Sequence, residues 1–206
     1  MLAMRKIRRG EQGFSILESL IVIAIILIML ALAVAQSFGS MESYRANAAM
    51  DTVVAQLRVA RQLAISQRRN VTVSFGTSGN PQTITYQVVA NPGDSIVPTP
   101  VTIPISTQVK LTGIAGEPDT PMAFGTCAGT YGVCIAGVNG GPPVMEFNSL
   151  GQFTDATLVN TLNGTVFLAI PSQIATPRAV TIMGSTGRVR SYTYIGGSTT
   201  STAWIE

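Results

Sequence analysis

Few residues of this chain have side chains that perform acid–base, metal or nucleophilic chemistry. The 206-residue sequence contains no histidine, which removes the commonest general base, the commonest metal ligand and every nucleophile that a histidine activates. The acids between residues 90 and 160 match neither a calcium loop nor a catalytic carboxylate pair; they are Asp94, Glu117, Asp119, Glu146 and Asp155. We therefore expect no enzyme activity, no metal, no cofactor and no small-molecule substrate.

The two cysteines, Cys127 and Cys134, are the next candidates, and they lie in a glycine-rich stretch. Without histidine or further cysteines they cannot complete a zinc site, and their spacing differs from that of a CxxC redox pair. In an exported domain such a pair forms a disulfide. We expect a structural Cys127–Cys134 bond that closes a small loop and contributes about 2 kcal/mol in the loop-entropy account.

Basic and aromatic residues occupy every second position of the last predicted strand. Arg188, Arg190, Tyr192 and Tyr194 fall on one face of it, and arginines beside aromatic rings can contact phosphate and stack on bases. Arg178 is a third candidate, from the preceding strand. The competing interpretation is an edge strand whose charges prevent pairing with other strands. We favour that role, because the chain after residue 13 carries equal numbers of basic and acidic side chains.

The element that leads into this body is an apolar N-terminal segment. Its leader holds Arg5, Lys6, Arg8 and Arg9 against Glu11 and so accounts for the whole net charge of +3. From Phe14 to Ala35 the segment is about 22 residues, or about 33 Å as a helix, which is enough to cross a hydrocarbon core. Basic residues before such a segment predict a cytoplasmic N-terminus and an exported body.

Two kinds of processing fit this segment. A secretory signal peptide would be cleaved after Ala33-Val34-Ala35 and would release a soluble β-domain. That interpretation leaves Glu18 unexplained, because a carboxylate at the mouth of an apolar run costs about 2–3 kcal/mol on insertion. A residue kept at that cost should have a partner.

The residues Gly13-Phe14-Ser15-Ile16-Leu17-Glu18 resemble the signal of type IV prepilins. The resemblance implies that a prepilin peptidase cuts between Gly13 and Phe14, removing residues 1–13 as a leader and N-methylating Phe14. It also implies that Glu18 is an assembly residue that pairs with the terminal amine of a neighbouring subunit. An ammonium and a carboxylate that meet in lipid offset each other's burial cost. We favour this processing over cleavage after Ala35.

Helical periodicity continues beyond the apolar run. One apolar stripe recurs every three or four residues, which predicts a helix from Phe14 to Gln67; its members are Ala46, Met50, Val53, Leu57, Ala60 and Ala64. We expect residues 14–35 to lie in lipid or a filament core. Residues 36–70 should form an amphipathic half that covers a sheet.

The pattern changes to a period of two after Asn70, which predicts a β-domain over residues 71–206. Residues 71–75 and 83–89 should form a hairpin around the turn-like Gly79-Asn80-Pro81. Further strands are predicted at residues 109–112, 144–147, 165–169, 179–183 and 188–195. The proline- and glycine-rich segment 91–143 should form long surface loops with one or two short strands.

The body resembles the GspH/FimT family of minor pseudopilins and pilins. The resemblance rests on residues 64–73, on Glu146-Phe147-Asn148-Ser149-Leu150-Gly151, on the strand near 166–170 and on Thr186-Gly187-Arg188-Val189-Arg190. It implies an α+β fold, in which a long N-terminal helix packs on an antiparallel β-sheet domain in the lollipop form of type IV pilins.

The family resemblance also implies a function. The chain would be a structural subunit of a fibre anchored in the bacterial inner membrane, in type II secretion or type IV pilus assembly. It would cross the membrane once, with its β-domain in the periplasm. Its partners would be other pilins or pseudopilins, the prepilin peptidase and membrane lipid. The alternative is a FimT-like, DNA-binding minor pilin for natural transformation, because Gly187-Arg188-Val189-Arg190 fits the motif implicated there.

Overall fold

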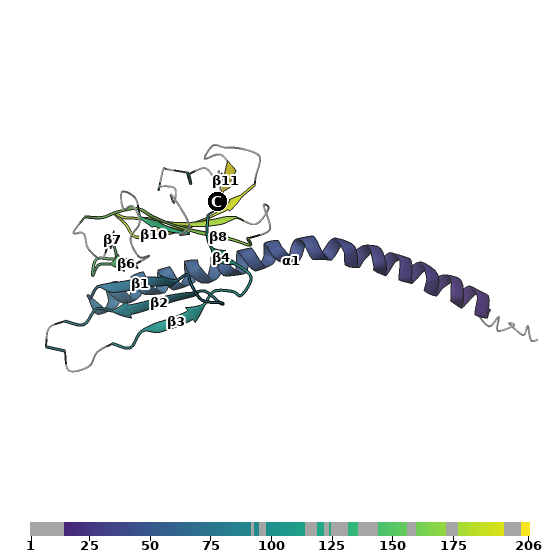
Figure 1. The fold of residues 1–206 in the computed structure, drawn as a ribbon, viewed down its shortest axis with the longest axis horizontal. Coiled ribbons are helices and arrows are strands. Elements are labelled where there is room, and N and C mark those ends of the chain that lie inside the picture. The colour runs from purple at the N-terminus through teal and green to yellow at the C-terminus, as the bar shows by residue number, and fades with distance from the viewer. Residues whose placement is uncertain are drawn as a thin grey trace, which may run out of the picture. The chain divides into compact units, whose positions relative to one another are not determined.

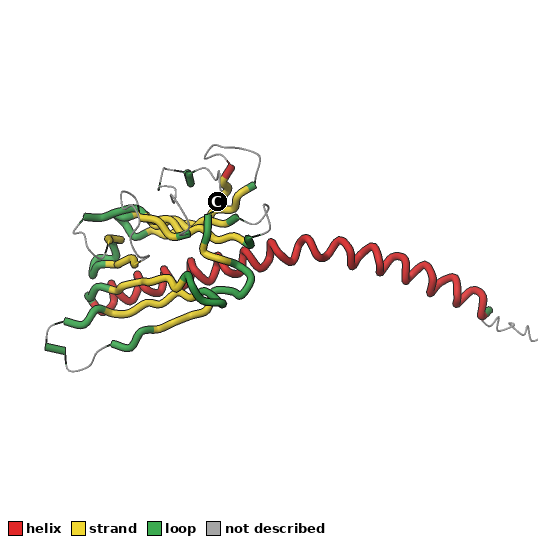
Figure 2. Tube along the Cα trace, in the orientation of Figure 1, coloured by secondary structure: helices red, strands yellow, loops and turns green. Residues whose placement is uncertain are grey.

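The computed structural model describes residues 15–91, 93–94, 98–113, 119–121, 124, 132–135, 144–155, 160–171, 177–195 and 203–206. A single helix, α1 (Ile16–Gln67), precedes all the strands (Figures 1 and 2). The chain divides into two compact units, Met1–Ser40 and Met41–Glu206, so that α1 contributes to both. The predicted helix is confirmed from Ile16 to Gln67.

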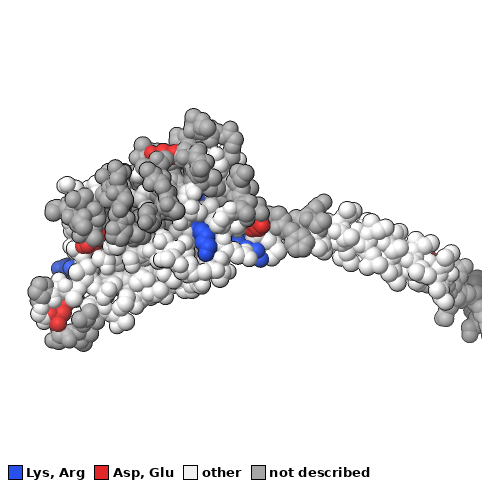
Figure 3. Space-filling model, viewed as in Figure 1, with Lys and Arg blue, Asp and Glu red and all other residues white. Residues whose placement is uncertain are grey.

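The described part of the first unit is the apolar first half of α1. The segment Ile16–Val34 has a mean hydropathy of 3.0, is long enough to cross a membrane, and has none of its residues buried. On the face shown in Figure 3 it is uncharged over nearly its whole length. Apolar side chains left uncovered in this way need lipid or another protein around them.

The second unit contains two antiparallel sheets, which Figure 1 shows as separate layers. Sheet A has the strand order β3-β2-β1-β6-β7, with bounds β1 Val71–Gly76, β2 Thr83–Val88, β3 Val101–Pro104, β6 Val144–Phe147 and β7 Phe153–Asp155. Sheet B has the order β11-β10-β9-β8-β4, and β5 also pairs with β8. Its bounds are β4 Lys110–Leu111, β5 Val133–Ile135, β8 Gly164–Ala169, β9 Arg178–Met183, β10 Arg188–Tyr194 and β11 Trp204–Ile205.

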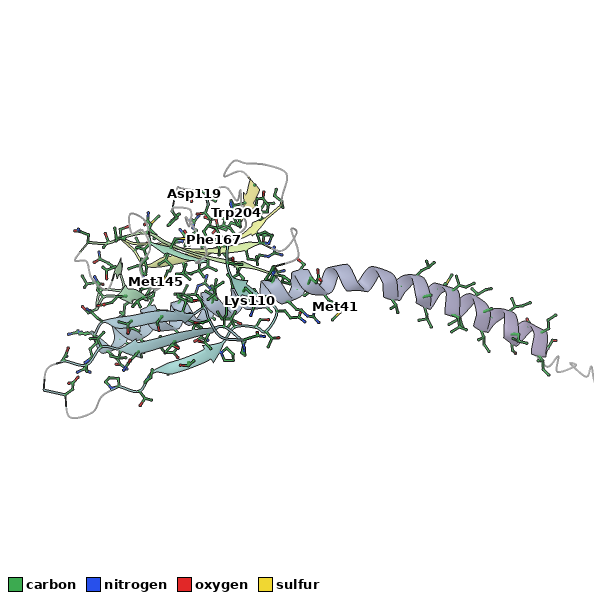
Figure 4. The ribbon with its side chains drawn as sticks, viewed as in Figure 1. Met41, Lys110, Asp119, Met145, Phe167 and Trp204 are labelled. Atoms are coloured by element: carbon green, nitrogen blue, oxygen red, sulfur yellow. The ribbon has the colours of Figure 1, made fainter. Side chains whose placement is uncertain are left out.

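One hydrophobic core joins the second half of α1 to both sheets. All six residues of the predicted helical stripe are buried, and all but Met50 are fully inaccessible, among them Val53, Leu57, Ala60 and Ala64. They share the core with Val71, Val73, Met145 and Phe147 from sheet A and with Val166, Leu168, Val180 and Ile182 from sheet B. Met145 is labelled in Figure 4. The second half of α1 therefore covers a β-core, as the periodicity predicts.

Sheet B is buried on its other face as well. Because side chains alternate along a strand, Phe167 and Ala179 point away from α1, and with Tyr192 and Trp204 they form a second, smaller cluster. The rings of Phe167 and Trp204 lie 6.0 Å apart, on one side of the sheet (Figure 4). This explains why β8 is buried at every position and why its residues 166–169 are all apolar.

The predicted hairpin is confirmed, with Val71 opposite Val88 and Gly76 opposite Thr83. The predicted strands at 144–147, 165–169, 179–183 and 188–195 correspond to β6, β8, β9 and β10. The described part of segment 91–143 holds three short strands, β3, β4 and β5, where one or two were predicted. Strands β7 and β11 were not predicted, because they are only three and two residues long and show no usable alternation.

Candidate functional site

Glu18 lies in the first turn of α1 and is exposed. It is the only charged residue of Ile16–Val34, and its neighbours Leu17 and Leu20 are 68% and 61% exposed. A carboxylate at this end of a helix is favoured by the helix dipole, but nothing in the apolar segment offers it a cation. Gly13 and Phe14, the predicted cleavage and methylation residues, lie outside the described residues.

The four residues predicted to share one face of β10 differ in their exposure to solvent. Arg188 is exposed, whereas Arg190 forms an ion pair with Glu206, with 3.0 Å between Nη1 and Oε2. A hydrogen bond with Tyr192, and then the Glu206 carboxylate, raises the pKa of the Arg190 guanidinium above its usual value. Arg190 is therefore already held within the domain.

The tyrosines of β10 are not free to stack on bases. Tyr192 is 3% exposed because it packs into the second cluster with Phe167 and Ala179. The ring of Tyr194 lies 5.3 Å from that of Trp204. The tyrosine end of the expected surface is thus packed, which the sequence could not show because the covering residue, Trp204, belongs to a two-residue strand.

Arg178 does not share a surface with Arg188 and Arg190. It is 2% exposed and points toward α1, where its Nε donates to Asn47 Oδ1 at 2.7 Å and its Nη2 donates to Ser43 Oγ at 3.0 Å. Its Nη1 donates to the carbonyl oxygen of Pro177. Burial lowers the pKa of this guanidinium. The expectation that Arg178 joins the basic patch is wrong on geometry, because β9 directs it to the opposite face of sheet B.

Gly187 has a structural role in the Gly-Arg turn. Its φ of +62° suits glycine, and a Cβ there would lie 1.9 Å from the carbonyl oxygen of Gly151 and 2.8 Å from Arg61 Nε. Arg61 Nε donates to that same Gly151 carbonyl at 3.1 Å. The turn before β10 and the turn between β6 and β7 therefore meet at the end of α1. Arg61 was not predicted as a functional residue; its place beside the apolar stripe was the only available signal.

The remaining candidates form no chemical centre among the described residues. Cys134 is disulfide-bonded, while Cys127 lies outside the described residues, as does Glu117. Asp94 pairs with Arg69, whose Nη2 is 2.6 Å from Oδ1; this hydrogen bond lowers the Asp94 pKa, helped by the backbone N–H of Asn91. Within the described ranges, no three His, Cys, Asp or Glu residues come together to hold a metal ion.

Comparisons with known proteins bear on both units. The family model for the type II transport protein GspH matches residues 49–190, and that for the prokaryotic N-terminal methylation motif matches residues 8–34. None of the curated proteins is similar enough to match the chain.

Solved structures of a minor pilin and of a minor pseudopilin are similar to the chain at low identity. The type IV minor pilin FimU of Pseudomonas aeruginosa is 14% identical, with a TM-score of 0.41 over 70% of this chain and 90% of that one. The minor pseudopilin EpsH of the Vibrio cholerae type 2 secretion system is 11% identical, with a TM-score of 0.43 over 72% of this chain and 97% of that one.

Proposed function

Because the chain belongs to the family of the type II transport protein GspH, we propose that it is a structural minor subunit of a fibre anchored in the inner membrane. The observation that carries the proposal is the first half of α1. Ile16–Val34 is apolar and entirely unburied, and its single charge is Glu18. The apolar side chains of such a segment need to be covered, by lipid before assembly and by other subunits after it. The body contributes no catalysis of its own.

Processing at Gly13-Phe14 prepares this segment for assembly. The match of the N-terminal methylation motif to residues 8–34 supports it. Removal of residues 1–13 takes away four basic side chains, which hold the N-terminus in the cytoplasm before cleavage. It also creates a new amine at Phe14, close to the membrane surface. The peptidase is thus a partner, and the chain is its substrate.

Assembly follows from charge pairing in a medium of low dielectric. Glu18 is costly alone in lipid, by about 2–3 kcal/mol. An ammonium from the Phe14 terminus of a neighbouring subunit offsets that cost. The pairing is available only between subunits that are staggered along the fibre, so it favours a defined position over random aggregation. Other pilins or pseudopilins are the partners that supply this amine.

The experiment compares Glu18→Val with the charge-retaining Glu18→Asp. Both full-length variants are produced with tagged pilin-like subunits of the same cell, and the fibres are isolated. We expect Glu18→Val to insert in the membrane as well as the wild type but to be depleted from fibres on the order of tenfold. Glu18→Asp should retain most incorporation. Equal recovery of Glu18→Val and the wild type would overturn the proposal.

Two machines use subunits of this kind, and a deletion strain distinguishes them. Loss of exported enzymes from the medium with normal pili assigns the chain to type II secretion. Loss of pili with normal secretion assigns it to a type IV pilus. The family description favours secretion, so we expect the first result.

DNA capture is the less supported alternative. Of the three candidate arginines, Arg188 alone is both exposed and without an ion pair among the described residues. One phosphate contact gives a log–log salt slope of only about −0.9. Replacing Arg188 and Arg190 with glutamine tests it: a clear loss of affinity for duplex DNA, with an unchanged melting temperature, would favour this alternative.

A further inference from the structure

A rigid turn holds Leu150 in solvent. Leu150 is 75% exposed, more than any other large apolar residue described in the second unit. Asn148 Oδ1 accepts the backbone N–H groups of Leu150 at 3.0 Å and of Gln152 at 2.9 Å, and its carbonyl accepts that of Gly151 at 2.8 Å. Gly151 adopts a φ of +76°. The turn needs Asn148 and Gly151, but nothing in its geometry requires a leucine at position 150.

This turn is seated against the last turns of α1. Arg61 Nε donates to the Gly151 carbonyl oxygen at 3.1 Å, and a Cβ on Gly151 would lie 2.6 Å from Ile65 Cδ1. Ile65 is itself 36% exposed. Two apolar side chains, Leu150 and Ile65, therefore lie on adjoining elements whose positions are fixed before any partner arrives.

Positive charge accompanies this apolar pair. From Thr52 to Arg69 the sequence contains four arginines and no carboxylate. Arg69 is paired with Asp94, whereas neither Arg58 nor Arg61 forms an ion pair with a described residue. Arg58 is exposed and lies one helical turn before Arg61, on the same side of α1. Arg61 contacts the turn that holds Leu150, and Arg58 extends the positive charge by one helical turn. Such cations on the same side of the helix as exposed apolar residues call for carboxylates and an apolar pocket.

We propose that Arg58, Arg61, Ile65 and Leu150, together the Leu150 surface, dock a neighbouring subunit of the fibre through an acidic face with an apolar pocket. The proposal rests on the proposed function, because the fibre supplies the partner. Leu150 is the anchor, and its fixed turn lowers the entropy lost on binding. The arginines orient the acidic face. A protein fits better than a nucleic acid, because phosphates offer no pocket for leucine.

The test measures binding of the full-length chain in detergent to each full-length pilin-like subunit of the same cell. The variants are Leu150→Ser and Arg58→Gln, which alter exposed side chains and leave the seating of Arg61 intact. Ile195→Ser is the matched apolar control, because Ile195 is 60% exposed elsewhere, and Lys110→Gln is the cationic control. We expect Leu150→Ser to weaken binding tenfold or more, and Arg58→Gln to weaken it about threefold at low salt and less at high salt. Both controls should bind as the wild type does.

The possible failures are distinguishable. If the wild type binds a subunit and Leu150→Ser binds it equally, the Leu150 surface is overturned while the proposed function stands. If the wild type binds none of the subunits, the proposed function fails as well. A labelled 30-base-pair duplex is titrated in parallel: DNA binding that is lost in Arg58→Gln but kept in Leu150→Ser assigns the surface to nucleic acid and also overturns the proposal. Emission of Trp204, the only tryptophan, verifies that each variant is folded.

Discussion

The two halves of α1 differ in what covers their apolar side chains. In Ile16–Val34 no residue is buried. Between Met41 and Gln67 the apolar stripe is buried against two sheets, with Leu57 and Ala60 fully inaccessible. The second half gains its stability from its own domain. The first half has no such cover within its described unit, so its stabilisation has to come from lipid and other subunits.

The polar residues of the two halves follow the same division. In the second half, Ser43, Asn47 and Arg61 are matched to groups of the domain, namely the Arg178 guanidinium and the Gly151 carbonyl. In the first half, Glu18 stands without a cation in its segment. One helix can thus contain residues that stabilise the fold and residues that serve assembly. Single substitutions should separate the two.

The largest expected effect is the difference in domain stability between two leucine-to-alanine substitutions, one in each half of α1. Leu57→Ala removes a fully buried side chain and should destabilise the domain by about 3–5 kcal/mol. Leu27→Ala, at a position that is 61% exposed, should leave domain stability unchanged. Urea unfolding of the full-length chain in detergent, followed by Trp204 emission, measures both. Similar losses for the two variants would contradict the division of α1.

The next effect tests the contact between the turn before β10 and the turn between β6 and β7, which meet at the end of α1. Gly187→Ala places a Cβ 1.9 Å from a backbone oxygen, so the turn has to shift, and we expect a loss of about 2–3 kcal/mol. Gly93→Ala is the matched control, since Gly93 also has a positive φ, +98°, but nothing lies within 4 Å of its Cβ position. It should cost about 1 kcal/mol. Equal losses would show that steric contact at Gly187 is unimportant.

A smaller effect is expected from the buried arginine. Asn47→Ala takes the acceptor from Arg178 Nε and leaves a buried charged donor short of one bond, at a cost of about 1–3 kcal/mol. Gln62→Ala, on the exposed side of the same helix, should change stability by less than about 0.5 kcal/mol. The comparison uses the same urea titration. No difference between the variants would remove Arg178 from the contacts that hold α1.

The smallest effect concerns the partly buried ion pair between Arg69 and Asp94, just beyond the end of α1. Arg69 lowers the pKa of Asp94, so the folded state binds fewer protons than the unfolded state in the acid range. The stabilisation is therefore present at neutral pH and is lost as the pH falls below about 4 and through the folded pKa. Asp94→Asn should have a slightly lower urea midpoint than the wild type at pH 7, and the difference between the two midpoints should shrink as the pH falls below about 4. A difference that grows on acidification would contradict this pairing.

Much of this architecture could be predicted from the sequence because two periodicities are strong. The spacing of Ala46 to Ala64 and the alternation after Asn70 identify the amphipathic helix and the first hairpin. The arginines could not be placed in the same way. Arg178 on β9 and Arg190 on β10 lie on opposite faces of sheet B, which depends on how the two strands pair. Their partners are distant in sequence: Asn47 is 131 residues from Arg178, and Glu206 is 16 residues from Arg190. The burial of Tyr192 could not be predicted either, because Trp204, which packs in the same cluster, lies in the two-residue strand β11.

If the first half of α1 is an assembly segment, it remains attached to the domain after processing. The mass of the mature chain, purified from cells that contain the prepilin peptidase, tests it most directly. We expect a chain that begins at N-methylated Phe14 and retains Glu18 and the whole of Ile16–Val34. A mature chain that begins at Gln36 would contradict it, because the domain would then be released without the segment that other subunits bind.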